Sequence, residues 1–387
     1  MPRGRGVAGR HKNVLGDSVM KAQKAAPDRI LVAMSGGVDS STAAWLLAKQ
    51  GLDVVGATLV FWPPEPERLV RRPGSAPAEA LGRAKAVCER IGIPHVTIHD
   101  ADRFWSQVVK VFCSEYAAGR TPNPCVICNP RVKWALLLEE ADKRGCAKVA
   151  TGHYARLSEN SGRIQILRGA DRTKDQSYAL YRLDQEALAR TVFPLGSLSK
   201  REVRRLAAEA GLGVASAPES QDLCFLPKGG YADFLRERLP MSPGPIEDLE
   251  GRTLGTHRGL GLYTVGQRKG LGIPFGTPLY VVAKDAARNR LVVGPREALC
   301  RTLVLVEEVN WVSMEPPVSG TCLSAEVELR YRARPLRAEI LVRDRQRVEI
   351  RLPPHGQAVA PGQSAVWYNG EVLLGGGVLS DREGISP

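Results

Sequence analysis

The sequence predicts an α/β domain with a parallel sheet, then a small α+β middle domain and a C-terminal all-β barrel domain. In the first part of the chain, short apolar runs alternate with segments of helical periodicity. This alternation is typical of a parallel sheet that has helices on both faces. From residue 278 onward, short segments of alternating polarity are separated by turn sequences such as Asn369-Gly370, as in a small barrel.

The parallel sheet is predicted from four apolar segments, and its helices from the amphipathic segments between them. The expected strands span residues 30–34, 53–61, 94–98 and 147–151. The expected helices span residues 42–49, 79–91, 103–118 and 132–144. Because ligands of such a sheet bind beyond the carboxyl ends of its strands, we expect the functional residues there.

The later domains are predicted from a change of pattern. Residues 227–273 are rich in Gly, Pro and Arg. We therefore expect a first domain at 29–215, a middle domain at 216–277 and a barrel domain at 278–387. The expected strands after residue 278 span residues 279–283, 290–293, 323–331, 337–342, 347–352, 364–368 and 372–379.

The basic N-terminal segment, residues 1–28, is expected to be a disordered tail. It lacks the apolar core of an export signal, and Asp17 and Asp28 interrupt the charge that a mitochondrial transit peptide would carry. No apolar run approaches the roughly 20 residues of a membrane helix, so we expect a cytoplasmic protein with no membrane contact. The formal net charge of +13 fits either a nucleic-acid ligand or an ordinary solvated surface.

A glycine-rich segment, SGGVDSS at residues 35–41, lies directly after an expected strand and before an expected helix. Its glycines would let the backbone approach a phosphate, and the helix N-terminus would supply free N–H groups. Its three serine hydroxyls add donors, and Asp39 would cradle the loop or help to place a metal ion. A Walker loop is excluded because Gly-Lys-Ser/Thr is absent, and the dinucleotide-like glycine spacing at residues 4–9 has no strand before it.

Eight cysteines in a long chain without an export signal indicate reduced thiols. Cys125 and Cys128 lie in a segment whose two prolines predict an extended backbone before the helix expected at 132–144. A thiol near a helix N-terminus has a lowered pKa, and its thiolate is both a nucleophile and a metal ligand. Cys224, which follows polar residues, is a third candidate; the alternative for each is an ordinary buried thiol.

Several pieces of the sequence together resemble the tRNA-specific 2-thiouridylase (MnmA) family of the PP-loop ATP pyrophosphatase superfamily. They follow that family's order from about residue 30 to residue 379. The pieces are AMSGGVDSS from Ala33, GRTPNPCVICN from Gly119, ATGHYAR from Ala150, KDQSYAL from Lys174, SQDLCF from Ser220, GLYTVGQRKGLGI from Gly261, LRYRARP from Leu329 and the run 361–379. The resemblance implies a Rossmann-like PP-loop domain that binds ATP with Mg²⁺ and adenylates a carbonyl oxygen, from which a nucleophile displaces AMP.

The implied reaction replaces the C2 oxygen of the wobble uridine of tRNA with sulfur. The resemblance implies that ATP contacts Ala33, Met34, Ser35, Gly36, Gly37, Val38, Asp39, Ser40, Leu59 and Gly152. The target base would lie against Asn123, Pro124 and Cys125. Cys128 would be the nucleophile and Cys224 the carrier of persulfide sulfur. Other parts of the tRNA would contact Lys174, Asp175, Gln176, Arg330 and Tyr331.

Two positions depart from the family's pattern. Arg83 stands where relatives often carry an acidic residue, and Cys125 stands where many carry Asp. Two sulfur routes are therefore open: a persulfide on Cys224 that is released with Cys128, or a [4Fe–4S] cluster held by Cys125, Cys128 and Cys224 that presents hydrosulfide. Zinc with His153 as a fourth ligand is a further alternative.

The implied partners are tRNA and an upstream sulfur donor, such as a cysteine desulfurase or a sulfur-relay protein, and we expect a monomer apart from tRNA. Two rival functions are weighed against this reaction. A PP-loop enzyme acting on a small molecule would not need the two cysteine sites or the basic β domain. A non-catalytic RNA-binding or iron–sulfur scaffold protein would not need an intact SGGVDS loop.

Overall fold

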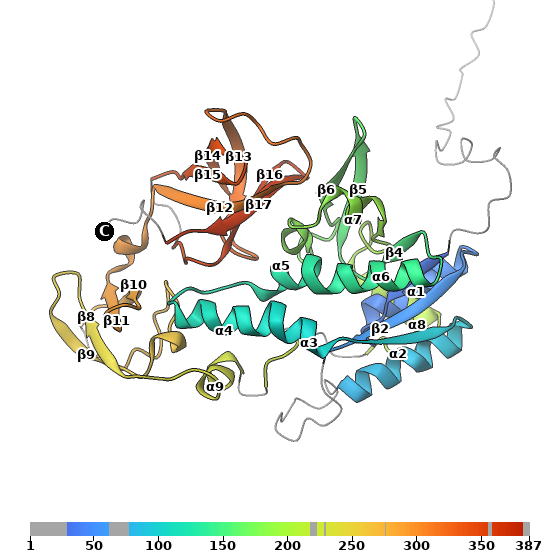
Figure 1. Ribbon diagram of the computed structural model, residues 1–387, viewed down its shortest axis with the longest axis horizontal. Helices are drawn as coiled ribbons and strands as arrows, with labels where there is room; N and C mark the ends of the chain where they lie inside the picture. The colour runs from blue at the N-terminus through green and yellow to red at the C-terminus, as the bar shows by residue number, and fades with distance from the viewer. Residues whose placement is uncertain are drawn as a thin grey trace, which may run out of the picture.

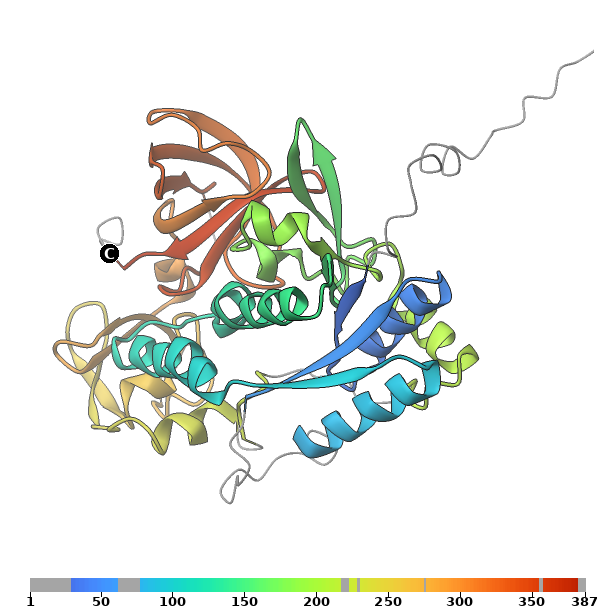
Figure 2. The same ribbon diagram turned by 45° about the vertical axis from the view of Figure 1, so that its right-hand side comes forward.

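The computed structural model describes residues 29–61, 77–216, 223–227, 230–274, 276–354 and 358–381. The predicted tail at 1–28 lies outside these residues, as do residues 220–222 of the SQDLCF piece. The described chain forms a parallel sheet, a smaller mixed sheet and an antiparallel sheet that closes into a barrel (Figures 1 and 2). The predicted fold class is therefore confirmed.

The first domain is built on a parallel five-stranded sheet in which every neighbouring pair is parallel. Its strands, in spatial order, are β3 (His95–His99), β2 (Val54–Val60), β1 (Ile30–Ala33), β4 (Lys148–Ala150) and β7 (Thr191–Val192). Helices α1 (Val38–Lys49), α2 (Pro77–Ile91) and α8 (Lys200–Glu209) pack on one face, and α6 (Ala135–Lys143) packs on the other. The four predicted strands of this sheet are confirmed to within a few residues.

Side-chain alternation along β1 divides the core into two layers. Ile30 and Val32 pack in the cluster that contains residues of α1, α2 and α8, whereas Leu31 packs in the cluster that contains residues of α6. These three side chains are buried, and each contributes about 1.5–3 kcal/mol to folding by leaving water. The central strand is therefore held firmly, together with the loop that follows it.

The strand order has a topological switch point at the carboxyl edge of the sheet. From β1 the chain proceeds to β2 and β3 on one side, and it later adds β4 and β7 on the other side. This point, at the carboxyl ends of β1 and β4, is the usual ligand position in open parallel sheets. The glycine-rich segment follows β1 directly, so the fold places it at this switch point.

One helical segment carries both cysteines of the proline-flanked sequence. It comprises α5 (Pro124–Cys128), the π-helical turn η2 (Asn129–Trp134) and α6. The prediction of an extended backbone is confirmed for Asn123 but wrong from Pro124, which occupies the first turn, where a missing N–H is tolerated. The Asn123 side chain caps the helix by accepting a 3.2 Å hydrogen bond from the Cys125 N–H. The wider η2 turn contains Pro130.

The other predicted helix of this region, at 103–118, is also divided. It consists of α3 (Ala101–Phe104), the π-helical turn η1 (Trp105–Val109) and α4 (Lys110–Ala117). Two short helices, η3 (Ser177–Leu180) and α7 (Gln185–Ala189), follow later in the first domain. Within the described ranges, no helix combines the length and the apolar character that crossing a bilayer demands.

The middle domain contains a four-stranded sheet and helix α9 (Gly230–Arg236). Its strands, in spatial order, are β10 (Tyr280–Asp285), β11 (Arg290–Gly294), β8 (Gly244–Glu247) and β9 (Thr253–His257). The short helix η4 (Leu260–Leu262) precedes β10, and the short helix η5 (Arg296–Leu299) follows β11. The two strands that we assigned to the barrel domain from residue 278 thus pair within the middle sheet, because alternating polarity does not reveal a strand's partner.

The C-terminal barrel closes because its first and last strands pair with each other. Around the barrel, the strands are β12 (Leu303–Trp311), β15 (Arg347–Arg351), β14 (Leu336–Asp344), β13 (Cys322–Glu328), β16 (Ser364–Asn369) and β17 (Val372–Leu379). A hairpin from the first domain, β5 (Ala155–Asn160) and β6 (Arg163–Arg168), adds to β17 through the pairs Val372–Leu167 and Leu373–Ile166. The hairpin and β12 are absent from the strands predicted above, and the hairpin joins the first domain to the barrel.

Candidate active site

The glycine-rich loop has a backbone that only glycine allows. Gly36 has a φ of +71°, and a Cβ placed on it would lie 2.1 Å from the carbonyl oxygen of Ala80 in α2. Gly37 is the N-cap of α1 and offers no side-chain acceptor to the first N–H groups of that helix. These N–H groups and the positive end of the helix dipole together form an anion-binding position.

Serine hydroxyls shape the loop from within. The Ser40 hydroxyl accepts a hydrogen bond from the Ser35 N–H at 3.1 Å and lies 3.1 Å from the Ser35 hydroxyl. It also donates to the Gly37 carbonyl at 3.3 Å. Ser41 is fully buried, and its hydroxyl has no hydrogen-bond partner among the described residues. Ser35 and Ser40 thus stabilise the turn, so the predicted phosphate would be bound mainly by backbone N–H groups.

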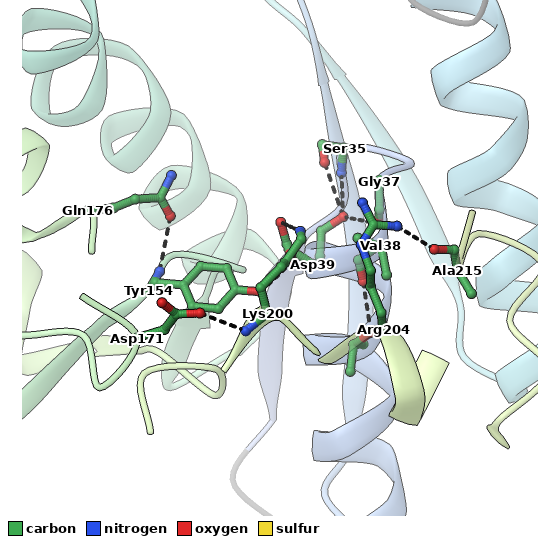
Figure 3. Close-up of polar contacts among 12 residues, drawn as sticks. Ser35, Gly37, Val38, Asp39, Tyr154, Asp171, Gln176, Lys200, Arg204 and Ala215 are labelled. Carbon is green, nitrogen blue, oxygen red and sulfur yellow. Dashed lines mark hydrogen bonds and ion pairs between the residues drawn. The ribbon is translucent and has the colours of Figure 1, made fainter. Parts of the chain in front are cut away.

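Asp39 is bound by two side chains that the sequence analysis did not single out (Figure 3). The ammonium of Lys200, at the start of α8, lies 2.7 Å from both carboxylate oxygens, and the Tyr154 hydroxyl donates to one of them at 2.7 Å. The backbone N–H of Lys200 is held in turn by Asp171 at 2.9 Å. Asp39 therefore fits the predicted role of cradling the loop. The alternative role, in which Asp39 helps to place a metal ion, stays a prediction, and a metal ion would share these oxygens with Lys200.

The remaining predicted ATP residues surround the same loop. Met34 is buried, and its N–H donates to the Ala57 carbonyl of β2 at 2.7 Å. Gly152 follows β4, and a Cβ on it would lie 2.8 Å from the backbone of Asp39 and Ser40. Leu59 is half-buried near the end of β2. The structure therefore brings the segments that follow β1 and β4 into direct contact at the switch point.

Cys128 lies in an apolar environment beside the end of the parallel sheet. It is 4% exposed and packs in one cluster with Phe61, which follows β2, and Phe225, which follows Cys224. Burial raises the pKa of the Cys128 thiol to about 12, although the nearby Lys133 ammonium acts in the opposite direction. The expectation of a lowered pKa is wrong for Cys128, because it ends α5 in the interior.

The three candidate cysteines are neighbours, but they do not form a metal site. The thiols of Cys125 and Cys224 both raise the pKa of Cys128 further, so they lie close to it. Cys125 and Cys224 are exposed. Within the described residues, no three His, Cys, Asp or Glu side chains converge as metal ligands would. Thiolates are suitable ligands for either an iron–sulfur cluster or a zinc ion, but the three thiols of the described structure are not arranged as its ligands, so cluster or zinc binding stays a prediction.

His153 connects the nucleotide loop with the cysteine helix. It follows Gly152, and its ring lies 5.6 Å from that of Trp134, the last residue of η2. Its Nδ1 shares a 2.7 Å hydrogen bond with the Thr151 hydroxyl. Burial, with a smaller effect of Lys133, lowers the pKa of His153 to about 3, so the imidazole is neutral. The nucleotide loop and the cysteines therefore share the carboxyl edge of the sheet.

The predicted tRNA residues come together from two domains. The rings of Tyr178 and Tyr331 lie 5.8 Å apart. Behind them, a buried network joins Arg168 to Glu328 at 2.6 Å and to Asp175 at 3.2 Å. Tyr331 is 38% exposed. The structure thus places the loop at 174–176 beside the β13–β14 turn at 330–331, although the two lie far apart in the sequence.

The side chains predicted to bind tRNA differ in their exposure and in the hydrogen bonds that they already make. The Asp175 carboxylate accepts hydrogen bonds from Arg168, from the Gly169 N–H and from Ser177, so its contact with tRNA stays a prediction. The Gln176 side chain accepts a 3.0 Å hydrogen bond from the Tyr154 N–H and thereby touches the loop that holds Asp39. Arg330 is exposed.

A small cavity opens beside the helix that bears Cys125 and Cys128. It has a volume of about 120 Å³ and lies between α4, α5 and the barrel. Its lining includes Asn123, Val126 and Arg131 from the cysteine helix and Ser364 from the barrel. Asn123, predicted to meet the target base, therefore lines a cavity while its side chain caps α5.

Family models cover most of the chain. Residues 28–228 match the model described as tRNA methyl transferase HUP domain, residues 232–295 the tRNA methyl transferase PRC-barrel domain, and residues 301–379 the aminomethyltransferase beta-barrel domain. A tRNA-specific 2-thiouridylase MnmA of Heliobacterium modesticaldum is 46% identical over 91% of this chain and 92% of its own length. The chain belongs to the tRNA-specific 2-thiouridylase family.

Other tRNA-specific 2-thiouridylases give the same result. The protein of that name from Chloroflexus aurantiacus is 48% identical over 92% of this chain and 99% of its own length, and one from a Synechococcus strain is 48% identical over 91% and 94%. A solved 4-thiouridine synthetase–RNA complex with bound ATP matches at 17% identity over 54% of this chain and 50% of that chain. The TM-score of this match is 0.35.

Four residues near the site of this 2-thiouridylase family member were missed or left without a role in the sequence reasoning. Lys200 and Tyr154 bind Asp39, Lys133 lies near the three thiols, and Arg83 donates to the loop carbonyl of Gly36. Only Tyr154 lies within a recognised piece, ATGHYAR. A lone basic residue in an amphipathic helix carries no sequence signal for the loop that it will meet.

Proposed function

We propose that this protein is a tRNA-uridine 2-sulfurtransferase, which replaces the C2 oxygen of the wobble uridine with sulfur at the expense of ATP. The observation that carries the proposal is the shared edge of the parallel sheet. The anion-binding loop after β1 and the helix that bears Cys125 and Cys128 both lie there, connected by Gly152, His153 and Trp134. Family membership supports the same reaction.

The first step is adenylation of the uridine. The C2 oxygen attacks the α-phosphate of ATP, and pyrophosphate leaves. The N–H groups at the start of α1 are suited to hold the negative pyrophosphate group as its charge increases. Mg²⁺ would be bound mainly through the phosphates and water, with Asp39 as the nearest carboxylate of the loop, whose charge Lys200 partly neutralises.

The second step transfers sulfur. A persulfide on the exposed Cys224 attacks C2, the C2–O bond breaks, and AMP leaves with the oxygen. The thiolate of Cys128 then attacks the Cys224 sulfur. The bond between that sulfur and the transferred sulfur breaks, its electrons form the thiocarbonyl, and a Cys128–Cys224 disulfide remains. An external thiol reduces this disulfide, and a sulfur donor such as a cysteine desulfurase or a relay protein reloads Cys224.

The alternative is hydrosulfide on a [4Fe–4S] cluster held by Cys125, Cys128 and Cys224. We derive no step through it, because these thiols do not converge as ligands in the described structure. Anaerobic purification followed by iron and sulfide analysis separates the routes. A colourless, iron-free and fully active protein supports the persulfide route, whereas activity proportional to bound iron supports the cluster.

The central experiment separates adenylation from sulfur transfer. The protein is incubated with ATP, a sulfur source and unmodified tRNA, and pyrophosphate and 2-thiouridine are quantified, the latter by mass spectrometry. Cys128→Ser should abolish 2-thiouridine but retain ATP binding and tRNA-stimulated pyrophosphate release. Cys322→Ser, which changes an exposed thiol on β13, is the matched control and should be fully active. Wild-type protein that forms no 2-thiouridine under these conditions would refute the proposal.

A further inference from the structure

The peptide that joins Gly36 to Gly37 is held from outside the loop by Arg83 of α2. The Arg83 Nε donates a 3.0 Å hydrogen bond to the Gly36 carbonyl oxygen. We propose that Arg83 is a positioning residue that turns the Gly37 N–H toward the phosphates of ATP. The inference rests on the proposed function only in naming ATP as the anion that the loop binds.

The argument begins with the geometry of the peptide unit. In a trans peptide, the carbonyl oxygen of one residue and the N–H of the next point to opposite sides. No cis peptide occurs among the described residues. Because the Gly36 carbonyl points toward Arg83 on α2, the Gly37 N–H points to the other side of the loop. That N–H begins the N-terminus of α1, where an anion is stabilised.

The contact is close and is specific to this part of α2. A Cβ on Gly36 would strike the Ala80 carbonyl, one turn before Arg83, so the helix backbone itself abuts the loop. A glycine with a φ of +71° can also adopt other backbone conformations easily, so an external hydrogen bond is needed to hold one of them. Arg83 supplies that bond from a rigid helix.

The charge of Arg83 reinforces the effect. A guanidinium that donates to a carbonyl polarises the whole peptide, which makes the N–H on the opposite side a stronger donor. Arg83 is 33% exposed and lies 3.9 Å from Glu79, a distance at which a surface pair is weak. The hydrogen bond brings this positive charge to the Gly36 carbonyl.

The contact depends on which residue stands at position 83. A carboxylate has no proton to donate to the Gly36 carbonyl, and its negative charge would oppose an anion in the loop. The loop of this protein is therefore oriented by a contact that an acidic residue cannot supply.

The test compares two arginines of the same helix. Arg90, two turns further along α2, also donates to a backbone carbonyl, that of Gly211, but it lies away from the loop. We would measure binding of ATP, pyrophosphate and adenosine by calorimetry for Arg83→Ala, Arg83→Lys and Arg90→Ala, and KM for ATP and kcat in the thiolation assay. Circular dichroism and urea unfolding identify any loss of folding.

Arg83→Ala should weaken ATP and pyrophosphate binding by roughly tenfold or more, with adenosine binding unchanged, since a charge-assisted contact is lost. The loss should appear mainly as a higher KM for ATP. Arg83→Lys, which can still donate to the carbonyl, should recover most of the affinity, and Arg90→Ala should bind all three ligands as wild type does.

Two results would overturn the inference: unchanged ATP and pyrophosphate affinity in Arg83→Ala, or an equal loss of adenosine binding, which would indicate a general structural role. If Arg83→Ala does not fold, Arg83→Met replaces it, because Met keeps an aliphatic side chain of similar length but cannot donate to the Gly36 carbonyl. A lower ratio of pyrophosphate to adenosine affinity in Arg83→Met supports the inference, and an unchanged ratio counts against it. A wild-type protein that binds ATP without forming 2-thiouridine would refute the proposed function alone, because the binding comparison does not depend on thiolation.

Discussion

Replacing Lys200 by Met tests the ion pair that anchors the nucleotide loop. The Lys200 ammonium lies 2.7 Å from both oxygens of Asp39. At this distance two unit charges attract by about 6 kcal/mol for an effective dielectric constant of ~20. Desolvation of Lys200 and the 34% exposure of the Asp39 side chain reduce the net effect. We expect Lys200→Met to lower the free energy of unfolding by roughly 1–3 kcal/mol.

The same change should weaken ATP binding for an electrostatic reason. Without Lys200, the negative charge of Asp39 in the first turn of α1 faces the triphosphate unneutralised, so affinity should fall by roughly tenfold or more. Asp39→Asn combined with Lys200→Met removes both charges and should recover much of that loss. Lys148→Met, at the opposite end of β4, is the control and should leave ATP affinity unchanged.

Calorimetric ATP binding and urea unfolding of the four combinations at positions 39 and 200 give the coupling energy directly. The reasoning fails if Lys200→Met weakens ATP binding by the same factor in the Asp39→Asn protein as in wild type. That result would mean that Lys200 acts on the nucleotide independently of Asp39.

Three further predictions follow from the environments of Cys128, Lys284 and Tyr331. Burial raises the pKa of Cys128 to about 12, so its thiolate fraction should rise about tenfold per pH unit from pH 7 to 9. The rate of sulfur transfer in a single turnover should rise by the same factor. A rate that does not change with pH in this range would contradict the prediction. Burial lowers the pKa of Lys284 in the folded protein to about 8. Between pH 8 and about 10 the unfolded chain therefore binds more protons at this residue than the folded protein does, and the free energy of unfolding should rise with pH. Lys284→Met should abolish this rise in urea unfolding measurements. Tyr331→Ala should weaken tRNA binding in filter assays by roughly tenfold, because one stacking contact with a base is lost. Tyr331→Phe keeps the ring and should bind tRNA as the wild type does. Equal binding by the wild type and both variants would exclude stacking.

The sheet and the nucleotide loop could be predicted because their signals are local. A buried strand, a glycine turn and a helix start lie next to one another at residues 30–49, and the structure has them in that order. The partners of Asp39 could not be predicted in the same way. Lys200 lies 161 residues away, and only the packing of α8 against α1 brings its ammonium to the loop.

The errors of the sequence reasoning have identifiable causes. Two prolines favoured an extended backbone at 121–129, but Asn123 and Pro124 together form a good helix start, so the chain is helical from Pro124 onward. The proximity of a helix favoured a lowered pKa for Cys128, but burial among Phe61 and Phe225 has the larger effect. The partners of β10 and β11 depend on contacts in the middle domain, which alternating polarity alone does not encode.

The addition of the β5–β6 hairpin to the barrel strand β17 has a consequence for synthesis on the ribosome. The hairpin is translated about 200 residues before β17, which corresponds to roughly 10–40 s at ordinary elongation rates. During that interval the pairing edge of β6 has no partner strand, and an open edge is where a nascent chain can join another. When β17 emerges, it closes the barrel by pairing with β12 and also covers the exposed edge of β6 in the ATP-binding domain.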